Sequence, residues 1–139
     1  MIRIELLEWE KAQPVAGPIR FAAFVEEQGV NSGVELDDMD PQCVHAIAYD
    51  EAGKAVGTGR LLPDGHIGRM AVTKEWRRQG VGAEILKALA EEARKRGHKE
   101  VVLSAQLQAA EFYREHGFVA EGKVYQEAGI LHQAMRKVL

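Results

Sequence analysis

The chain has 139 residues, of which 46% are hydrophobic and 28% are charged, as in an ordinary folded protein and unlike a disordered one. This length predicts one domain over residues 1–139. Because 18 Lys and Arg stand against 21 Asp and Glu, the net charge is −3, and the general positive field that draws proteins to nucleic acids or anionic membranes is missing. We therefore expect neither nucleic acid nor a membrane as a partner.

The sequence favours the cytoplasm and argues against a bound metal. Cys43 is the single cysteine and cannot form an internal disulfide, and Arg3 and Glu5 place charges where a signal peptide needs an apolar core. No uncharged apolar run approaches the roughly 20 residues of a membrane helix. The histidines lack the spacing of metal ligands, and residues 38–40 begin like a calcium loop without its later glycine and glutamate. We expect no metal site.

The first predicted elements are a strand and a helix. Alternating apolar and polar residues predict a strand over 2–8. Apolar residues at helical spacing predict a helix near 18–28, because Pro14 interrupts the chain before it and Pro18 suits a first helical turn. Glycines then end this helix, and we expect residues 35–41 to form an acidic surface loop.

The rest of the chain alternates strands with two helices. Short apolar or alternating runs predict strands over 44–49, 55–62, 67–72, 101–103, 118–125 and 130–138. Amphipathic spacing predicts helices over 80–96 and 109–116. The order β-α-β-β-β-α-β-α-β-β therefore predicts an α/β (α+β) fold, in which helices flank a mixed, mostly antiparallel sheet.

The turn before the long amphipathic helix carries two glycines, Gly80 and Gly82. Glycine lets the backbone approach a ligand closely, and the free N–H groups of a helix's first turn carry the positive end of the helix dipole. Arg77 and Arg78 add positive charge at the same place. The turn predicts a phosphate site, although a solvated pair of arginines beside an ordinary strand–helix turn explains these residues equally well. The spacing excludes a P-loop and a dinucleotide fingerprint.

Two motifs resemble those of a known family. Residues 77–82 resemble the R/Q-x-x-G-x-G/A motif of the GNAT superfamily of acyl-CoA-dependent N-acetyltransferases. Residues 106–118 resemble its second motif, N-x-x-A-x-x-x-Y-x-x-x-G-F, with Gln106 where asparagine is usual. The order of predicted elements agrees with that family's fold along nearly the whole chain.

Within the superfamily, the sequence is most similar to the small ElaA-like and YjcF-like proteins. The residues that suggest this branch are 20–28, the acidic loop ending in Asp40 with His45 beyond it, and 125–132. The resemblance implies an enzyme that moves an acetyl group from acetyl-CoA to a primary amine by direct attack in a ternary complex.

The resemblance also implies where coenzyme A binds. The backbone N–H groups of residues 79–83 would hold the pyrophosphate, and the pantetheine arm would pair with the strand ending at Val72, whose N–H would meet the thioester carbonyl. The implied cofactor residues are Met70, Ala71, Val72, Arg77, Arg78, Gln79, Gly80, Val81, Gly82, Ala83, Gln106, Ala109 and Tyr113.

The catalytic residues are less constrained. Helical spacing alone favours a core aromatic at Tyr113, but the second motif reverses this preference and implies that Tyr113 protonates the departing thiolate. Many relatives carry a basic glutamate on the strand before the pyrophosphate loop, but residues 68–70 supply no carboxylate. The candidates for the general base are Glu26, Glu27, His45, His132 or a water, and we put forward Glu27 and His45 beside Tyr113.

Two other classes of function stay open. A non-catalytic acyl-CoA-binding or regulatory domain would keep the cofactor loop without a competent base. A protein-interaction domain would show no thermal shift with acetyl-CoA. The acceptor is expected to be a small-molecule or protein amine, and a homodimer through edge strands is compatible with the predicted sheet.

Overall fold

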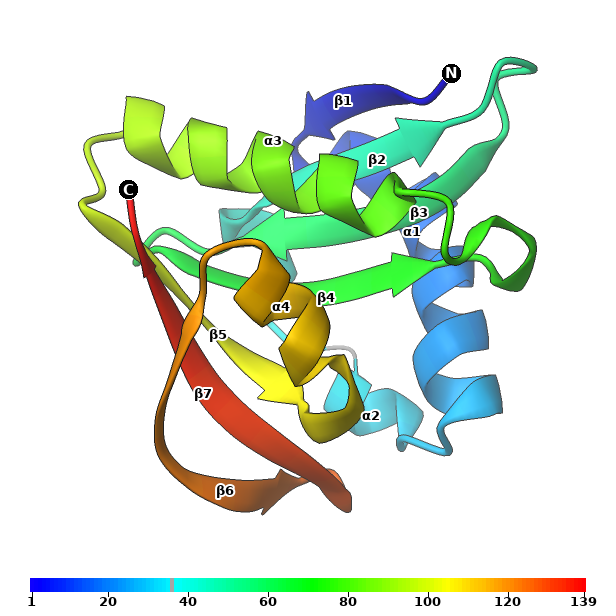
Figure 1. Cartoon of the computed structure of the whole chain (residues 1–139). Helices are drawn as coiled ribbons and strands as arrows, with labels where there is room; N and C mark the ends of the chain where they lie inside the picture. The colour runs from blue at the N-terminus through cyan, green and yellow to red at the C-terminus, as the bar shows by residue number, and fades with distance from the viewer. Residues whose placement is uncertain (36) are drawn as a thin grey trace.

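The computed structural model describes residues 1–35 and 37–139, in which helices lie on both faces of one seven-stranded sheet (Figure 1). The strands are β1 (Arg3–Leu7), β2 (Val44–Tyr49), β3 (Ala55–Leu61), β4 (His66–Val72), β5 (Glu100–Gln106), β6 (Val119–Glu127) and β7 (Ile130–Val138). The helices are α1 (Trp9–Arg20), the π-helical η1 (Phe21–Glu27), α2 (Ser32–Glu35), α3 (Val81–Lys95) and α4 (Ala110–Glu115). Short 3-10 turns occupy Asp40–Gln42, Lys74–Trp76 and Leu107–Ala109.

The sheet has the order β1-β2-β3-β4-β5-β7-β6, and every neighbouring pair is antiparallel except β4 and β5. The predicted fold class and the order of the main elements are therefore confirmed. The largest core lies between the sheet and helices α3 and α4, and a second core forms where α1 covers the opposite face. None of the helices in the described residues has the length and apolarity of a membrane span.

The first helix starts earlier than predicted, at Trp9 instead of residue 18. Its buried face carries alanines one turn apart, Ala12 and Ala16, which pack on the sheet around Ile47. This packing outweighs the hydrogen bond that Pro14 removes from the helix. Glycine at position 17 also lacks the Cβ that would crowd a following proline ring. The prediction that the helix begins at Pro18 was wrong, because Pro14 and Pro18 both lie inside α1.

The sheet opens between β4 and β5. These parallel strands pair only where His66 and Ile67 meet Val102 and Leu103, although both continue for several residues. From Gly68 to Val72, the edge of β4 that faces β5 has no strand partner in the described part of the chain. The register between β3 and β4 also shifts by one residue near Arg69, whose φ of 49° is left-handed, as in a β-bulge.

The acidic segment at 35–41 is exposed at Asp38 and Pro41, but the prediction of a surface loop was wrong for its carboxylates Glu35 and Asp40. Glu35 and Asp40 are 5% and 2% exposed, because both carboxylates pair with the buried guanidinium of Arg20. Residue 36 lies outside the described residues. Charge alone predicted exposure, whereas the arginines that neutralise this segment come from distant parts of the chain.

Candidate active site

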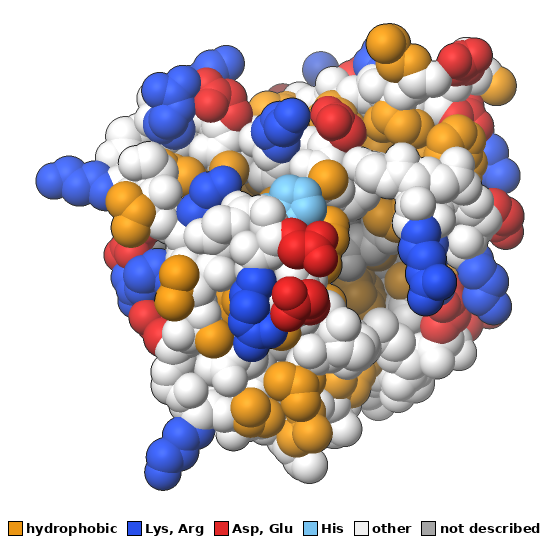
Figure 2. Space-filling view, in the orientation of Figure 1, with side chains coloured by type: hydrophobic (Ala, Val, Ile, Leu, Met, Phe, Trp, Pro, Cys, Tyr) orange, Lys and Arg blue, Asp and Glu red, His pale blue; other side chains and the backbone are white. Residues whose placement is uncertain are grey.

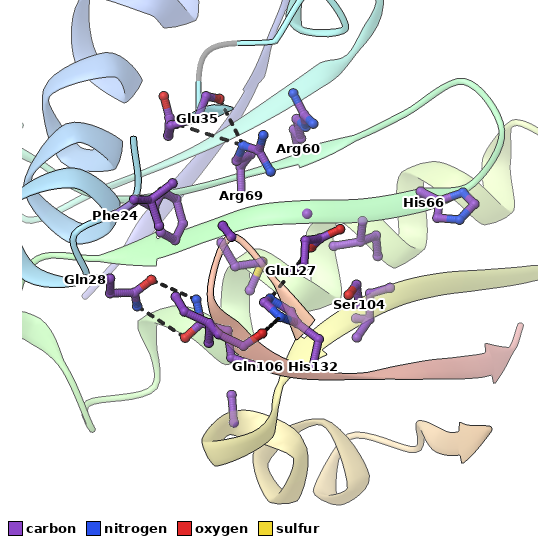
Figure 3. Close-up of a pocket in the computed structure, with 18 of the residues that line it drawn as sticks. Phe24, Gln28, Glu35, Arg60, His66, Arg69, Ser104, Gln106, Glu127 and His132 are labelled. Carbon is purple, nitrogen blue, oxygen red and sulfur yellow. Dashed lines mark hydrogen bonds and ion pairs between the residues drawn. The ribbon is translucent and has the colours of Figure 1, made fainter. Parts of the chain in front are cut away.

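A cavity of about 550 Å³ fills the opening between β4 and β5 (Figure 3). Its wall includes side chains from η1, β3, β4, β5, α4, β6 and β7, so it joins segments that lie far apart in the sequence. Figure 2 shows the adjoining face hollowed between α4 and the segment leading into α3, with apolar side chains in the hollow and both basic and acidic side chains at its rim.

The N-terminus of α3 presents free backbone donors beside this opening (Figure 1). Gly80 adopts a left-handed φ of 86° at the N-cap, and its carbonyl accepts the first helical hydrogen bond, from the N–H of Glu84. Within the described chain, no protein acceptor pairs with the N–H groups of residues 79–83. The exposed side chain of Arg78 lies on the same turn. This geometry suits an anion.

Arg77 holds this turn in place. Its guanidinium donates two hydrogen bonds of 2.8 Å to Glu27 and one of 3.0 Å to the carbonyl of Val72. The hydrogen bond from Arg77 lowers the pKa of the Glu27 carboxyl, which makes Glu27 a weaker base. Glu26 is exposed on the same segment and does not line the cavity.

The free edge of β4 leads from the cavity towards α3. The N–H of Thr73 donates to the carbonyl of Val56 on β3, at 2.9 Å. Because successive N–H groups of a strand point to opposite edges, the N–H of Val72 faces the opening. Met70 lines the cavity, while the side chain of Ala71 is buried in a small cluster with Ile19.

The position of Tyr113 is compatible both with a core aromatic and with a residue that reaches the active site. Its side chain is 9% exposed and packs edge-on against Phe112 and Phe118, with ring centroids 5.1 and 5.8 Å apart, yet it also lines the cavity. Burial raises the pKa of the phenol to about 12. Across the described residues, its hydroxyl has no hydrogen-bond partner.

Gln106 and Ala109 also line the cavity. The carboxamide of Gln106 exchanges two hydrogen bonds with Gln28 of the segment after η1, at 2.8 and 3.2 Å, and accepts a third from Gln108, at 2.7 Å. Figure 3 shows Gln28 and Gln106 facing each other at one end of the cavity. The glutamine that replaces the usual asparagine therefore links β5 to the region of η1.

His45 lies away from the cavity. Its side chain is 1% exposed, and its ring packs on the Trp9 ring with centroids 4.7 Å apart. Its Nε2 lies 3.0 Å from the carbonyl oxygen of Asp40. Burial lowers the pKa of His45. Cys43 is buried nearby, and burial raises the pKa of its thiol to about 11, so it is held as an unreactive thiol.

His132 lies on the cavity wall together with Glu127, a residue that our sequence analysis did not single out. The Nε2 of His132 lies 3.7 Å from Oε2 of Glu127 (Figure 3). Of the four side chains considered as the base, His132 is thus the one that lines the cavity.

A charge network, of which Arg20, Arg60, Glu35 and Asp40 are buried, closes the far end of the cavity, and the sequence did not predict it. Its members are Arg20, Arg60, Arg69, Glu35, Asp37 and Asp40. Asp37 accepts two hydrogen bonds of 2.8 Å from Arg60. Asp40 lies between two arginines, accepting bonds of 2.9 and 3.0 Å from Arg20 and one of 2.9 Å from Arg60. The sequence does contain one indication of this network, because Arg60 and Arg69 each interrupt a predicted apolar strand.

This fold and site define an acyl-CoA N-acyltransferase of the GNAT class. The family model for the acetyltransferase (GNAT) domain matches residues 18–139, and the chain belongs to that family. The match confirms the resemblance of the two motifs and makes the protein an acyltransferase, with a fold that implies acyl-CoA binding.

Individual relatives point to the ElaA/YjcF-like branch. The chain is 39% identical to the uncharacterized N-acetyltransferase YjcF of Bacillus subtilis over 123 residues, which cover 86% of this chain and 87% of that protein. It is 26% identical to Escherichia coli ElaA, whose crystal structure aligns with a TM-score of 0.85 over 99% of both chains. An acyl-CoA N-acyltransferase structure from Pseudomonas aeruginosa aligns with a TM-score of 0.87 at 27% identity, over 99% of this chain and 100% of that one.

Proposed function

We propose that this protein transfers the acetyl group of acetyl-CoA to a primary amine by direct attack within a ternary complex. The observation that carries the proposal is one continuous path. It runs from the unpaired N–H groups at the start of α3, along the free edge of β4, to the cavity that Tyr113 lines.

The residues present fit coenzyme A. The N–H groups of residues 79–83 would hold the pyrophosphate, with Arg78 adding charge. A Cβ at Gly80 would meet no protein atom within 4 Å, so the space beside Gly80 is open to a ligand, whereas one at Gly82 would be in van der Waals contact with Phe112 and Val72. The free edge of β4 would pair with the pantetheine amides as an added strand.

The transfer chemistry has two donors in place. The N–H of Val72 faces the opening and would stabilise charge developing on the thioester oxygen, a contribution worth on the order of 3 kcal/mol in acyl transfer. A thiol such as that of coenzyme A has a pKa of about 8.5, whereas burial raises the pKa of Tyr113 to about 12. Full proton transfer from the phenol to the thiolate is therefore uphill, and we assign Tyr113 as a hydrogen-bond donor to the departing sulfur.

The cofactor part of the proposal is tested by calorimetry with acetyl-CoA. Arg78→Ala removes an exposed charge at the start of α3, and Lys95→Ala removes one at the other end of the same helix. We expect Arg78→Ala to weaken binding by about two- to fivefold, as for a solvated charge pair, and Lys95→Ala to leave the Kd unchanged. Absence of binding by the wild-type protein would refute the proposal.

The transfer itself is tested by thiol release with a panel of primary amines. Amine-dependent release and an acetylated product are expected. Tight acetyl-CoA binding without turnover on any amine would instead favour the non-catalytic acyl-CoA-binding alternative.

A further inference from the structure

The ring of His132 is held in one orientation at the cavity wall. Its Nδ1 lies 2.7 Å from the carbonyl oxygen of Ile130, and because a carbonyl only accepts, Nδ1 carries the hydrogen. The ring also stacks on the Tyr125 ring, with centroids 6.0 Å apart and an interplanar angle of 24°. The Tyr125 hydroxyl in turn contacts Ser104. The nitrogen left to accept a proton is Nε2.

Glu127 faces that nitrogen without bonding to it directly. The 3.7 Å between its Oε2 and Nε2 of His132 exceeds a hydrogen-bond length. Figure 3 shows the two side chains pointing towards each other at the cavity. A neutral imidazole nitrogen and a carboxylate are both acceptors, and an ammonium group, which has three N–H donors, satisfies both at once.

The surrounding charges favour a cation at this place. The charge network contains three arginines and three carboxylates, so its charges cancel. Two of its carboxylates, Glu35 and Asp37, line the cavity but are engaged by arginines. Among the described cavity-lining residues, Glu127 is the carboxylate that no arginine or lysine contacts. It therefore supplies the uncompensated negative charge of the cavity.

We propose that Glu127 and His132 receive the acceptor amine of the transfer reaction, and that Nε2 of His132 is its general base. This inference rests on the proposed function. His132 removes one proton from the bound ammonium, and the neutral amine forms a C–N bond to the thioester carbonyl carbon as the C–S bond breaks. The second proton leaves the nitrogen on collapse, so that one of the two protons ends on the thiol and the other passes to solvent.

Other ionisable groups share this environment. Those that line the cavity are Tyr113, His66, Glu35, Asp37, Arg60 and Arg69, and Tyr125 packs against the His132 ring. The test therefore compares variants across pH and does not rest on a single profile of the wild-type protein.

The test measures acetylation of n-butylamine and cadaverine from pH 7 to pH 10. In His132→Gln, we expect kcat/KM to fall by at least tenfold at pH 7 and the loss to shrink towards pH 10, because an alkylamine with a pKa near ~10.4 then loses its proton without a base. In Glu127→Gln, the KM for the amine should rise by more than kcat falls. Glu115→Gln, which neutralises an exposed carboxylate on α4, is the matched control.

The Kd for acetyl-CoA separates failure of this inference from failure of the proposed function. It should be the same in all variants. A wild-type protein that binds acetyl-CoA but acetylates neither these two amines nor any other primary amine of the panel would refute both the amine site and the proposed function. A protein that acetylates other amines of the panel but neither of these two would refute the amine site alone. An active wild-type protein with a His132→Gln loss that is the same at every pH would refute the base alone, since a structural role lowers activity uniformly. An unchanged amine KM in Glu127→Gln would refute the amine site.

Discussion

At the level of single residues, burial decides what the ionisable groups near the cavity can do. The same loss of water that raises the pKa of Tyr113 to about 12 also lowers that of His45. A buried phenol remains protonated throughout the pH range of enzyme assays and acts only as a donor. A buried, neutral His45 that is packed on Trp9 has no route to the cavity and serves the packing of β2 against α1.

Replacement of Tyr113 tests its role as a donor. Tyr113→Phe keeps the ring contacts with Phe112 and Phe118 and removes only the hydroxyl. We expect kcat to fall by about 10- to 100-fold, the equivalent of one hydrogen bond to a charged group, with an unchanged Kd for acetyl-CoA. Because the phenol does not ionise between pH 6 and 9, the loss should be the same factor across that range. Full turnover by the variant in a thiol-release assay would remove Tyr113 from the mechanism.

Asp37 gives the charge network a pH dependence that can be measured. The hydrogen bonds from Arg60 lower the pKa of Asp37 from 3.8 to about 2. A carboxyl with a depressed folded-state pKa stabilises the protein above pH 3.8, and this stability is lost as the pH falls towards 2. The free energy of unfolding of Asp37→Asn, measured with urea, should therefore fall less between pH 4 and pH 2 than that of the wild type. Asp38→Asn, which changes an exposed neighbour, should follow the wild-type curve.

At the level of elements, two glycines set the distance between α3 and the sheet. A Cβ at Gly59 would lie 2.8 Å from Sδ of Met70 and 2.9 Å from Cγ2 of Ile85, and one at Gly57 would lie 2.9 Å from Cδ1 of Ile85. Such distances are too short for carbon contacts, so α3 rests on the bare backbone of β3. This close packing also places the start of α3 beside the end of β4.

Gly59→Ala should therefore destabilise the protein. Overpacking of a core contact costs about 1–3 kcal/mol, because side chains on α3 must move. Gly68→Ala is the matched control on the neighbouring strand, since a Cβ there would meet no atom within 4 Å. Urea unfolding measures both variants. Equal stability of the two would contradict the close approach of α3 to β3.

The elements differ in how well the sequence predicts them, and the reason is the range of the interactions that form them. Helix α3 was predicted to within a residue at each end because its apolar face and its glycine boundaries are local signals. The start of α1 was missed because burial of Ala12 and Ala16 against distant strands overrides two prolines. The short α2 and the buried carboxylates beside it depend on Arg20, Arg60 and Arg69, which no local pattern connects with them.

At the level of the whole molecule, the proposed cofactor side and the proposed acceptor side of the site have different origins. Most of the residues proposed to hold coenzyme A lie within one strand–turn–helix unit, residues 70–83, so their motif could be read from contiguous residues. The acceptor side forms where β5, β6 and β7 come together, with Tyr125 opposite His132 in the register. His132 was a candidate base by residue type alone, and Glu127 was not considered, because only the strand pairing brings them to the same cavity.

The separation of the proposed cofactor side from the proposed acceptor side predicts where coenzyme A will protect the backbone from hydrogen exchange. At 100 times its Kd, a ligand stabilises the folded state by about 2.7 kcal/mol, which slows exchange through global unfolding everywhere by about 100-fold. Amides on the free edge of β4 and at residues 79–83 exchange without global unfolding, because no acceptor in the described part of the protein pairs with them. Exchange of these amides should slow only where the ligand covers them.

Strand β1 is the internal control, since it lies at an outer edge of the sheet, away from the cavity. Mass spectrometry of exchange with and without coenzyme A should show local protection at residues 68–72 and 79–83 and none on the outer edge of β1. Protection of β1 without protection of β4 would place the ligand elsewhere on the molecule.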